Sequence, residues 1–317
     1  MGTSYNIVVV DHNRALKQEV LHDAVEATLR DVNARFSNWD QNSEVSRFNR
    51  RHMTDPIAVS ADFTEVMSIA NIVHEASEGQ FDVTLAPLVE LWGFGAPGGT
   101  LEPPGDDAIA KAMARTGQQV VLASTNGGRR LRKTVPSASI YLAAIAKGYG
   151  IDKVAGRLKS MGASHYMVEI GGDLLTAGAN PNGAPWRIGV ERPDAAMRTV
   201  EDVVYVSGLG MATSGDYRLY FEYDGERYSH IIDATTGRPV THATASVTVL
   251  AESAALADAW ATALLALGSE RGMPIAEKNE IAALFIDRRD DNGDIQFHHI
   301  QNERFARLQA YDTTGRP

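Results

Sequence analysis

The sequence contains no cysteine, so disulfides, thiolate nucleophiles and cysteine-ligated zinc are excluded. It also lacks a long hydrophobic segment. The longest nearly apolar run, 254–267, covers 14 residues, whereas a transmembrane helix needs about 20. Positive charge is scarce, because 30 Lys and Arg stand against 40 Asp and Glu. The net charge of −10 argues against nucleic acid as the main partner. A small ligand that carries phosphate remains open, since a metal ion can offset its charge.

The remaining composition is that of a globular protein. Of the 317 residues, 44% are apolar and 22% are charged, which excludes a disordered, collagen-like or coiled-coil chain. The length fits two ordinary domains or one large one. We find no internal repeat and no linker, and we therefore predict a single domain over residues 1–317.

Hydrophobic periodicity predicts a mixture of helices and short strands. Helical spacing occurs at 15–36, 60–77, 106–116, 145–161 and 254–267, with Ser43 and Ser253 as N-caps and Gly268 as the end of the last helix. Strand patterns occur at 5–11, 166–170, 174–177, 187–190, 203–207, 218–223, 227–232, 246–250, 281–287 and 295–300. Runs of antiparallel strands with separate helices favour an α+β fold over a doubly wound sheet. The segment 79–99 is dense in Gly, Pro and aromatic residues and is predicted to be a binding loop.

The helix predicted at 254–267 holds the most informative polar residues. Only Asp258 and Thr262 are polar in it, and their i, i+4 spacing places both on one face. A carboxylate among Ala and Leu needs a partner or a cation, and carboxylate and hydroxyl oxygens suit Mg²⁺. The alternative is a structural Asp that accepts hydrogen bonds from the backbone or an Arg.

A second candidate is the segment SHIID at 229–233, at the end of a predicted strand. His230 and Asp233 there form a candidate acid–base pair. The alternative is a structural histidine that is hydrogen-bonded to a loop.

Several other motifs suit a ligand that has phosphates and a ring. Ser214 is a candidate nucleophile or phosphate contact, although no Gly-x-Ser-x-Gly elbow surrounds it. Lys147, at a helix start, offers a cation beside free amides, and Gly171-Gly172-Asp173 permits a close approach to the backbone. Trp39 and the segment 92–95 offer aromatic rings for stacking, but such rings more often pack in a core.

The order of these motifs closely resembles that of the FAD:protein FMN transferases of the ApbE type. The matching segments are MGT at 1–3, NSEVSRFN at 42–49, GQFDVT at 79–84, PLV at 87–89, LWGFG at 91–95, AKGY at 146–149 with Asp152, GGD at 171–173, ATSGDY at 212–217, SHIID at 229–233, and ADA at 257–259 with Thr262.

The resemblance implies one α+β domain that binds FAD in a cleft. It implies that FAD is split with the help of Mg²⁺, that AMP is released, and that FMN is joined through a phosphoester to a threonine of a partner, such as a respiratory or electron-transfer flavoprotein subunit. Some relatives instead hydrolyse FAD to FMN and AMP. A flavin-binding protein without turnover is the alternative from another class.

The resemblance also implies roles for individual residues. His230 is the candidate base, and Asp258 and Thr262 hold Mg²⁺ together with the main-chain carbonyl of Ala144. The predicted FAD contacts are Met1, Trp39, Trp92, Gly93, Phe94, Lys147 and Ile232, to which we add Ser214 and Tyr141. Tyr141 stands where the family usually has an Asp that bonds the adenosine part of FAD, so the contacts on that side are expected to differ.

Family members are often exported, with a signal sequence or lipid anchor before the MGT segment. Here that segment begins at Met1 itself. We therefore expect a leader to have been removed and the protein to act in the periplasm or on the outer face of the membrane. A cytoplasmic member is the alternative.

Overall fold

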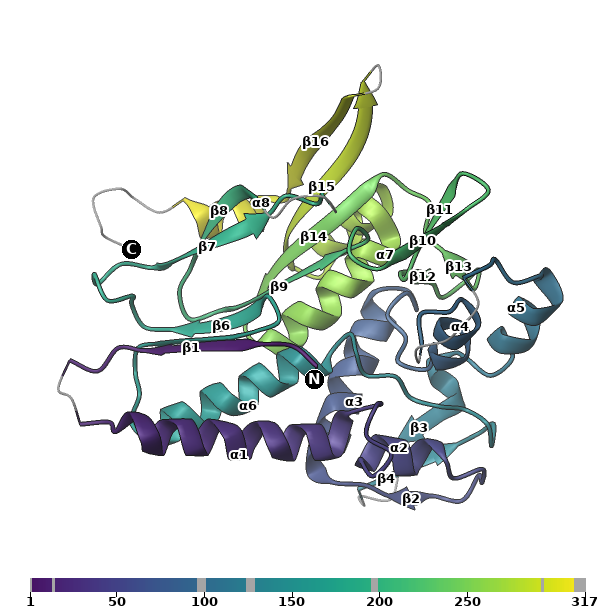
Figure 1. Ribbon diagram of the computed structural model, residues 1–317, viewed down its shortest axis with the longest axis horizontal. Helices are drawn as coiled ribbons and strands as arrows, with labels where there is room; N and C mark the ends of the chain where they lie inside the picture. The colour runs from purple at the N-terminus through teal and green to yellow at the C-terminus, as the bar shows by residue number, and fades with distance from the viewer. Residues whose placement is uncertain are drawn as a thin grey trace. The chain divides into compact units, whose positions relative to one another are not determined.

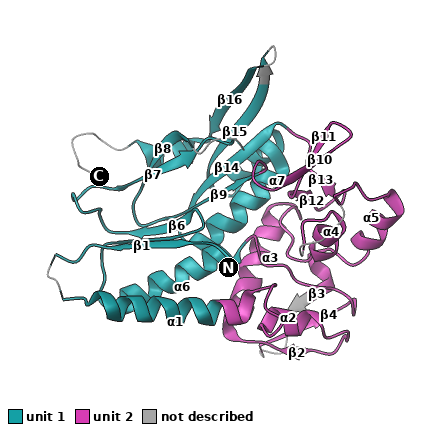
Figure 2. Ribbon diagram, viewed as in Figure 1, with its two compact units in different colours: residues 1–32, 145–215, 243–317 teal, residues 33–144, 216–242 magenta. Residues whose placement is uncertain are grey.

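The structure is a computed structural model that describes residues 2–12, 15–95, 101–123, 129–194, 199–291 and 294–310. Met1, a predicted FAD contact, lies outside the described residues. None of the helices described in these ranges is long and apolar enough to cross a membrane. Contacts divide the chain into two compact units (Figure 2): unit 1 comprises 1–32, 145–215 and 243–317, and unit 2 comprises 33–144 and 216–242. The single domain over 1–317 stays a prediction.

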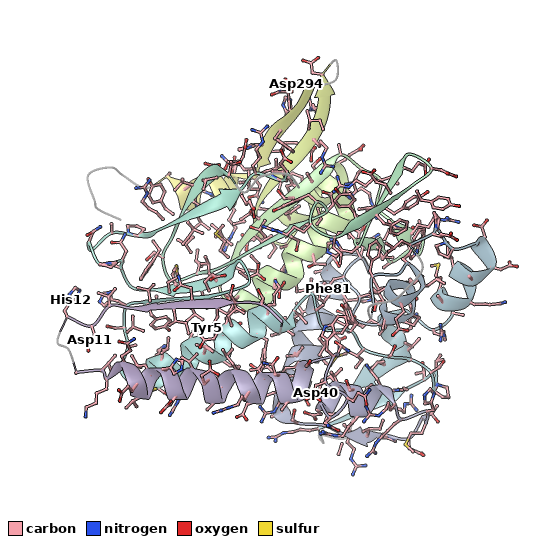
Figure 3. The ribbon with its side chains drawn as sticks, viewed as in Figure 1. Tyr5, Asp11, His12, Asp40, Phe81 and Asp294 are labelled. Carbon is pink, nitrogen blue, oxygen red and sulfur yellow. The ribbon has the colours of Figure 1, made fainter. Side chains whose placement is uncertain are left out.

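Unit 1 is built on a seven-stranded sheet in which neighbouring strands run antiparallel (Figure 1). The strands in spatial order are β1 (Tyr5–Val9), β5 (Tyr166–Ile170), β6 (Asp173–Ala177), β9 (Gly210–Gly215), β14 (Thr244–Ala251), β15 (Ala282–Asp291) and β16 (Asp294–Gln301). Figure 3 shows Asp294 near the far end of the β15–β16 hairpin. The predicted α+β class is confirmed, and most predicted strands lie within two residues of the observed ones.

Both faces of this sheet are covered. Helices α1 (Gln18–Phe36) and α6 (Ala146–Ser160) share a core with β5, and Gly272 of α7 (Ala254–Lys278) packs against Phe285 of β15. Leu284, the neighbour of Phe285, faces the other way and joins a core with Phe305 of α8 (Glu303–Gln309) and with the two-stranded ribbon β7 (Trp186–Glu191) and β8 (Val200–Val206).

The prediction that a helix ends at Gly268 is confirmed, because Gly268 is not helical and separates two helical segments of α7. Gly268 has φ 72° and ψ 170°, and a second helical segment follows it to Lys278. That conformation is open almost only to glycine. The helix resumes because the Ser269 amide donates to Thr244 Oγ1 at 2.8 Å and the Ser269 hydroxyl donates to Asp287 Oδ2 at 2.6 Å. Gly268 is therefore a kink that contacts with β14 and β15 stabilise.

Unit 2 contains the shorter elements. Its helices are α2 (Glu44–Asn49), α3 (Ala61–Ala76), α4 (Ala86–Leu91) and α5 (Asp106–Met113), with a 3-10 turn at Gln118–Val120. Its strands form a sheet ordered β2 (Ile57–Ala58), β4 (Arg130–Lys133), β3 (Val121–Ala123), and two hairpins, β10 (Tyr220–Tyr223) with β11 (Glu226–Ser229) and β12 (Ile232–Asp233) with β13 (Arg238–Pro239). The predicted cap is confirmed, because Ser43 Oγ accepts from the Ser46 amide at 3.1 Å.

The core of unit 2 contains a fully buried lysine. Lys133 Nζ donates to the carbonyl oxygens of Asn49 at 2.9 Å and Arg51 at 3.0 Å, and it lies 5.0 Å from the centre of the Phe48 ring. Burial lowers the pKa of Lys133 from 10.5 to about 8.

This lysine predicts a pH dependence of stability. The pKa of Lys133 is lower in the folded than in the unfolded protein, so the folded state disfavours the charged ammonium. The free-energy cost of burying that ammonium decreases as the pH rises from about 8 toward 10.5, because the unfolded protein then loses the proton as well. We expect the free energy of unfolding of the parent protein to increase over that pH interval because of Lys133. The Lys133→Met variant should lack this increase. Urea unfolding of both proteins between pH 7 and pH 10 measures it. Parallel pH profiles would contradict the assignment.

Candidate active site

Three charged side chains of unit 1 form what we call the carboxylate cluster: Lys147, Asp173 and Asp258. They come from the first turn of α6, the start of β6 and the first half of α7. Lys147 Nζ contacts Asp173 Oδ2 closely and lies 3.5 Å from Asp258 Oδ1. The amide of Gly148 donates to Asp258 Oδ2 at 3.0 Å. The two carboxylates are 2% and 4% exposed, whereas the lysine side chain is 32% exposed.

The charges of this cluster do not balance. Within the described residues, Lys147 is the cation paired with both carboxylates, so two negative charges share one ammonium. Burial raises the pKa of Asp258 to about 7; Lys147 opposes this shift and Asp173 adds to it. The pKa of Lys147 is raised even though burial lowers it, because both carboxylates favour the ammonium. An additional cation would therefore stabilise the ionised form of Asp258.

Hydroxyl groups extend the oxygen-rich surface next to Asp258. Thr262 lies one turn further along α7, and its Oγ1 is 3.1 Å from Ser214 Oγ on β9. The predicted helix containing both Asp258 and Thr262 is thus confirmed, and Ser214 adds a third side chain from a neighbouring strand. The described residues contain no group of three or more His, Cys, Asp or Glu placed to hold a metal. Any metal here would take one or two carboxylates together with hydroxyls, water and substrate oxygens, as Mg²⁺ commonly does.

Two residues of α6 fix the helix that carries Asp258. The Asp152 carboxylate accepts from the amides of Ala254 and Ala255 at 2.8 and 2.9 Å, and so caps the start of α7. The resemblance matches Asp152 together with the AKGY segment, but it implies no role for this residue. Gly148 lies so close to α7 that an added Cβ would stand 2.2 Å from the carbonyl oxygen of Ala254.

We predict that Gly148→Ala destabilises unit 1. A methyl group 2.2 Å from a backbone oxygen forces α6 and α7 apart, and overpacking of this kind costs about 1–3 kcal/mol. Gly156→Ala is the matched control, because nothing lies within 4 Å of its added Cβ on the same helix, and it should be neutral or stabilising. Thermal unfolding measures the stability of both variants. Equal melting temperatures of Gly148→Ala and the parent protein would contradict the packing argument.

His230 lies in unit 2, between β11 and β12, and is partly buried. The Leu219 carbonyl oxygen is 3.0 Å from His230 Nδ1 and also accepts from the His230 amide at 3.0 Å. Because a carbonyl only accepts, Nδ1 carries the proton and Nε2 of the neutral ring keeps a free lone pair. Burial lowers the pKa of His230, and the Leu219 hydrogen bond and Asp216 only partly oppose it. The ring is therefore held neutral in one tautomer.

Asp233 organises the turn that follows His230. Its Oδ1 accepts from the Thr235 amide at 2.7 Å, the Thr235 hydroxyl at 2.6 Å and Gln80 Nε2 at 3.2 Å. Burial raises the pKa of Asp233, but these hydrogen bonds outweigh it and the net shift is downward. The carboxylate therefore stays ionised and supports a turn. Its pairing with His230 stays a prediction.

The segment predicted as a binding loop, 79–99, is only partly a loop. It contains α4, and Trp92 and Phe94 after that helix are 1% and 7% exposed. Trp92 donates from its ring nitrogen to the Gly237 carbonyl at 2.8 Å and stacks on Tyr228. Ile232 joins the same core. These side chains pack unit 2 in this structure, and contacts of Trp92, Gly93, Phe94 and Ile232 with FAD stay predictions.

Two other predicted FAD contacts line one cavity of unit 2. Trp39 and Tyr141 border a space of about 420 Å³ together with polar side chains that include Asn38, Arg50 and Glu90. Trp39 is 62% exposed, and burial raises the pKa of Tyr141. An exposed indole beside a phenol suits a planar ligand. Ala144 also belongs to unit 2, and the metal-binding role of its carbonyl stays a prediction.

Comparison with known proteins assigns the chain to a family. The model of the ApbE family matches residues 1–285. The chain belongs to the ApbE family. It is 43% identical over 291 residues to a FAD:protein FMN transferase of Vibrio cholerae, covering 92% of this chain and 86% of that protein. It is 41% identical over 295 residues to the protein of the same name from Haemophilus influenzae, covering 92% and 85%. The solved structure of the flavin transferase ApbE from Vibrio cholerae matches with a TM-score of 0.88 and 40% identity, over 97% of this chain and 96% of that one.

Proposed function

We propose that this protein is a FAD:protein FMN transferase that uses Mg²⁺ to move FMN from FAD to a threonine of an acceptor protein, with release of AMP. Membership of the ApbE family and relatives of that name at about 40% identity support the reaction. The observation that carries the metal dependence is the buried cluster of two carboxylates around one ammonium.

The residues of the cluster fit Mg²⁺ by their chemistry. Asp258, Thr262 and Ser214 offer a carboxylate and two hydroxyls, and with Asp258 ionised the cluster has a net negative charge. Phosphoryl transfer depends on charge neutralisation and positioning, and a bound Mg²⁺ supplies that neutralisation to the pyrophosphate oxygens of FAD. Lys147, which the resemblance implies as a FAD contact, lies between Asp173 and Asp258, and its side chain is one-third exposed.

His230 fits the part of the general base. The hydroxyl of a threonine is a weak acid, so a base must take its proton while the bond to phosphorus forms. The neutral ring with Nδ1 held by Leu219 presents Nε2 as the acceptor of that proton. The bond that forms joins the threonine oxygen to the FMN phosphorus, and the bond that breaks releases AMP.

One experiment separates this function from its alternatives. The protein is incubated with FAD and Mg²⁺, with and without a threonine-bearing acceptor, and AMP and the acceptor mass are measured. We expect AMP only with the acceptor, and an acceptor heavier by one FMN. AMP without an acceptor would instead indicate a FAD pyrophosphatase, and no AMP in either case a flavin-binding protein. A location in the periplasm or on the outer membrane face stays a prediction, to be tested by cell fractionation.

A further inference from the structure

Asp173 contributes its charge to the carboxylate cluster, but neither the resemblance nor the proposed mechanism gives its side chain a specific role. It opens β6, is almost completely buried, and each of its oxygens has a partner. Oδ1 accepts from the Thr213 amide at 3.3 Å, and Oδ2 contacts Lys147 Nζ. Asp173 is therefore fixed by the sheet on one side and holds the ammonium on the other.

The ammonium is shared unequally between the two carboxylates. Lys147 Nζ touches Asp173, whereas it lies 3.5 Å from Asp258, at the outer limit of a hydrogen bond. Asp258 Oδ2 accepts from the Gly148 amide, and Oδ1 faces the ammonium at 3.5 Å, so Oδ1 is the oxygen for which a bound cation and the ammonium would compete. Whatever holds the ammonium away from Oδ1 keeps this ligand position open.

We propose that Asp173 is a positioning residue for the metal site: it holds the Lys147 ammonium so that Asp258 Oδ1 remains available to Mg²⁺. This inference rests on the proposed function, because it concerns the same metal site. Without the charge of Asp173, Asp258 is the carboxylate that remains within reach of the lysine. The ammonium then pairs fully with Asp258 and competes with the metal for the same oxygen.

The test is a cycle of four proteins: the parent, Asp173→Asn, Lys147→Met and the double variant. Asn has the shape of Asp and keeps an oxygen for the Thr213 amide, but it has no charge to hold Lys147. Mg²⁺ affinity is measured by isothermal titration calorimetry without FAD, and Mn²⁺ binding by electron paramagnetic resonance. Neither readout depends on turnover.

We expect Asp173→Asn to weaken Mg²⁺ binding about 10- to 100-fold when Lys147 is present, in the range found for residues that orient a metal ligand. In the Lys147→Met background, the factor by which Asp173→Asn weakens Mg²⁺ binding should be at least ten times smaller, because no ammonium is left to move onto Asp258. This difference between backgrounds is the coupling that a double-mutant cycle isolates. Asp173→Ser, carried through the same cycle, gives the same answer if the Asn variant fails to fold.

Each other outcome overturns the proposal in a distinct way. Equal losses in the two backgrounds would mean that Asp173 acts by its own charge or as a direct ligand. Unchanged affinity of Asp173→Asn with Lys147 present would mean that it has no part in metal binding. If the parent protein bound no Mg²⁺ at all, the proposed metal site would fall first and this inference with it.

Discussion

Replacement of Asp258 by Asn is expected to abolish Mg²⁺-dependent transfer while the protein remains folded. Asp258 is the cluster carboxylate on α7, and its Oδ1 lies 3.5 Å from the Lys147 ammonium, while Oδ2 accepts from the Gly148 amide. The Asn side chain removes the negative charge that we propose to bind the metal. Because a metal contributes several kcal/mol to charge stabilisation in such reactions, the rate should fall by about 10³-fold. Rates of FMN attachment at limiting Mg²⁺ measure the effect.

Folding should survive this change for reasons visible in the structure. The Asn oxygen can still accept from the Gly148 amide, and the cost of burying an incompletely paired carboxylate disappears. Asp287→Asn is the matched control, because Asp287 is also buried in unit 1 but accepts from Thr244 and Ser269. The control should lower stability by about 1–3 kcal/mol and leave Mg²⁺ affinity unchanged. Full activity of Asp258→Asn at limiting Mg²⁺ would show that the metal binds elsewhere.

Local sequence patterns predicted the parts of the site that depend on local geometry. The i, i+4 spacing of Asp258 and Thr262 requires only a helix, and the apolar residues around them predict that this helix is buried. Ser43 and Ser253 were identified as caps because the capping bond spans three residues.

Contacts between distant segments were not accessible in this way. Lys147 is 26 residues from Asp173 and 111 from Asp258, and no periodicity links them. The helical segment that follows Gly268 was not predicted, because the side chains that bind its first residue come from β14 and β15. The strand β9 was not predicted, because polar residues such as Thr213 and Ser214 hide its pattern while they bond to Thr248 and Thr262.

Replacement of His230 by Asn is expected to slow transfer by roughly 10²- to 10⁴-fold, the usual contribution of a positioned acid–base group. The substituted amide cannot accept the threonine proton in place of Nε2. Binding of FAD and Mg²⁺ should persist, because neither requires a base. FAD titration and FMN attachment, measured on the same preparation, separate the two effects. His299→Asn is a control outside the proposed site, since His299 on β16 contacts Glu201 of β8, and it should transfer FMN normally.

The pH dependence of the parent protein provides an independent test of the same role. Only the neutral imidazole accepts a proton, so the rate should rise as the pH climbs through the pKa of His230 and then level off. Because burial lowers that pKa, the midpoint should lie below 6.5, the value of an unperturbed histidine. The His230→Asn variant should lose this rise along with most of its rate. Transfer at the parent rate would remove His230 from the mechanism, whereas loss of FAD binding would make it a ligand contact instead of the base.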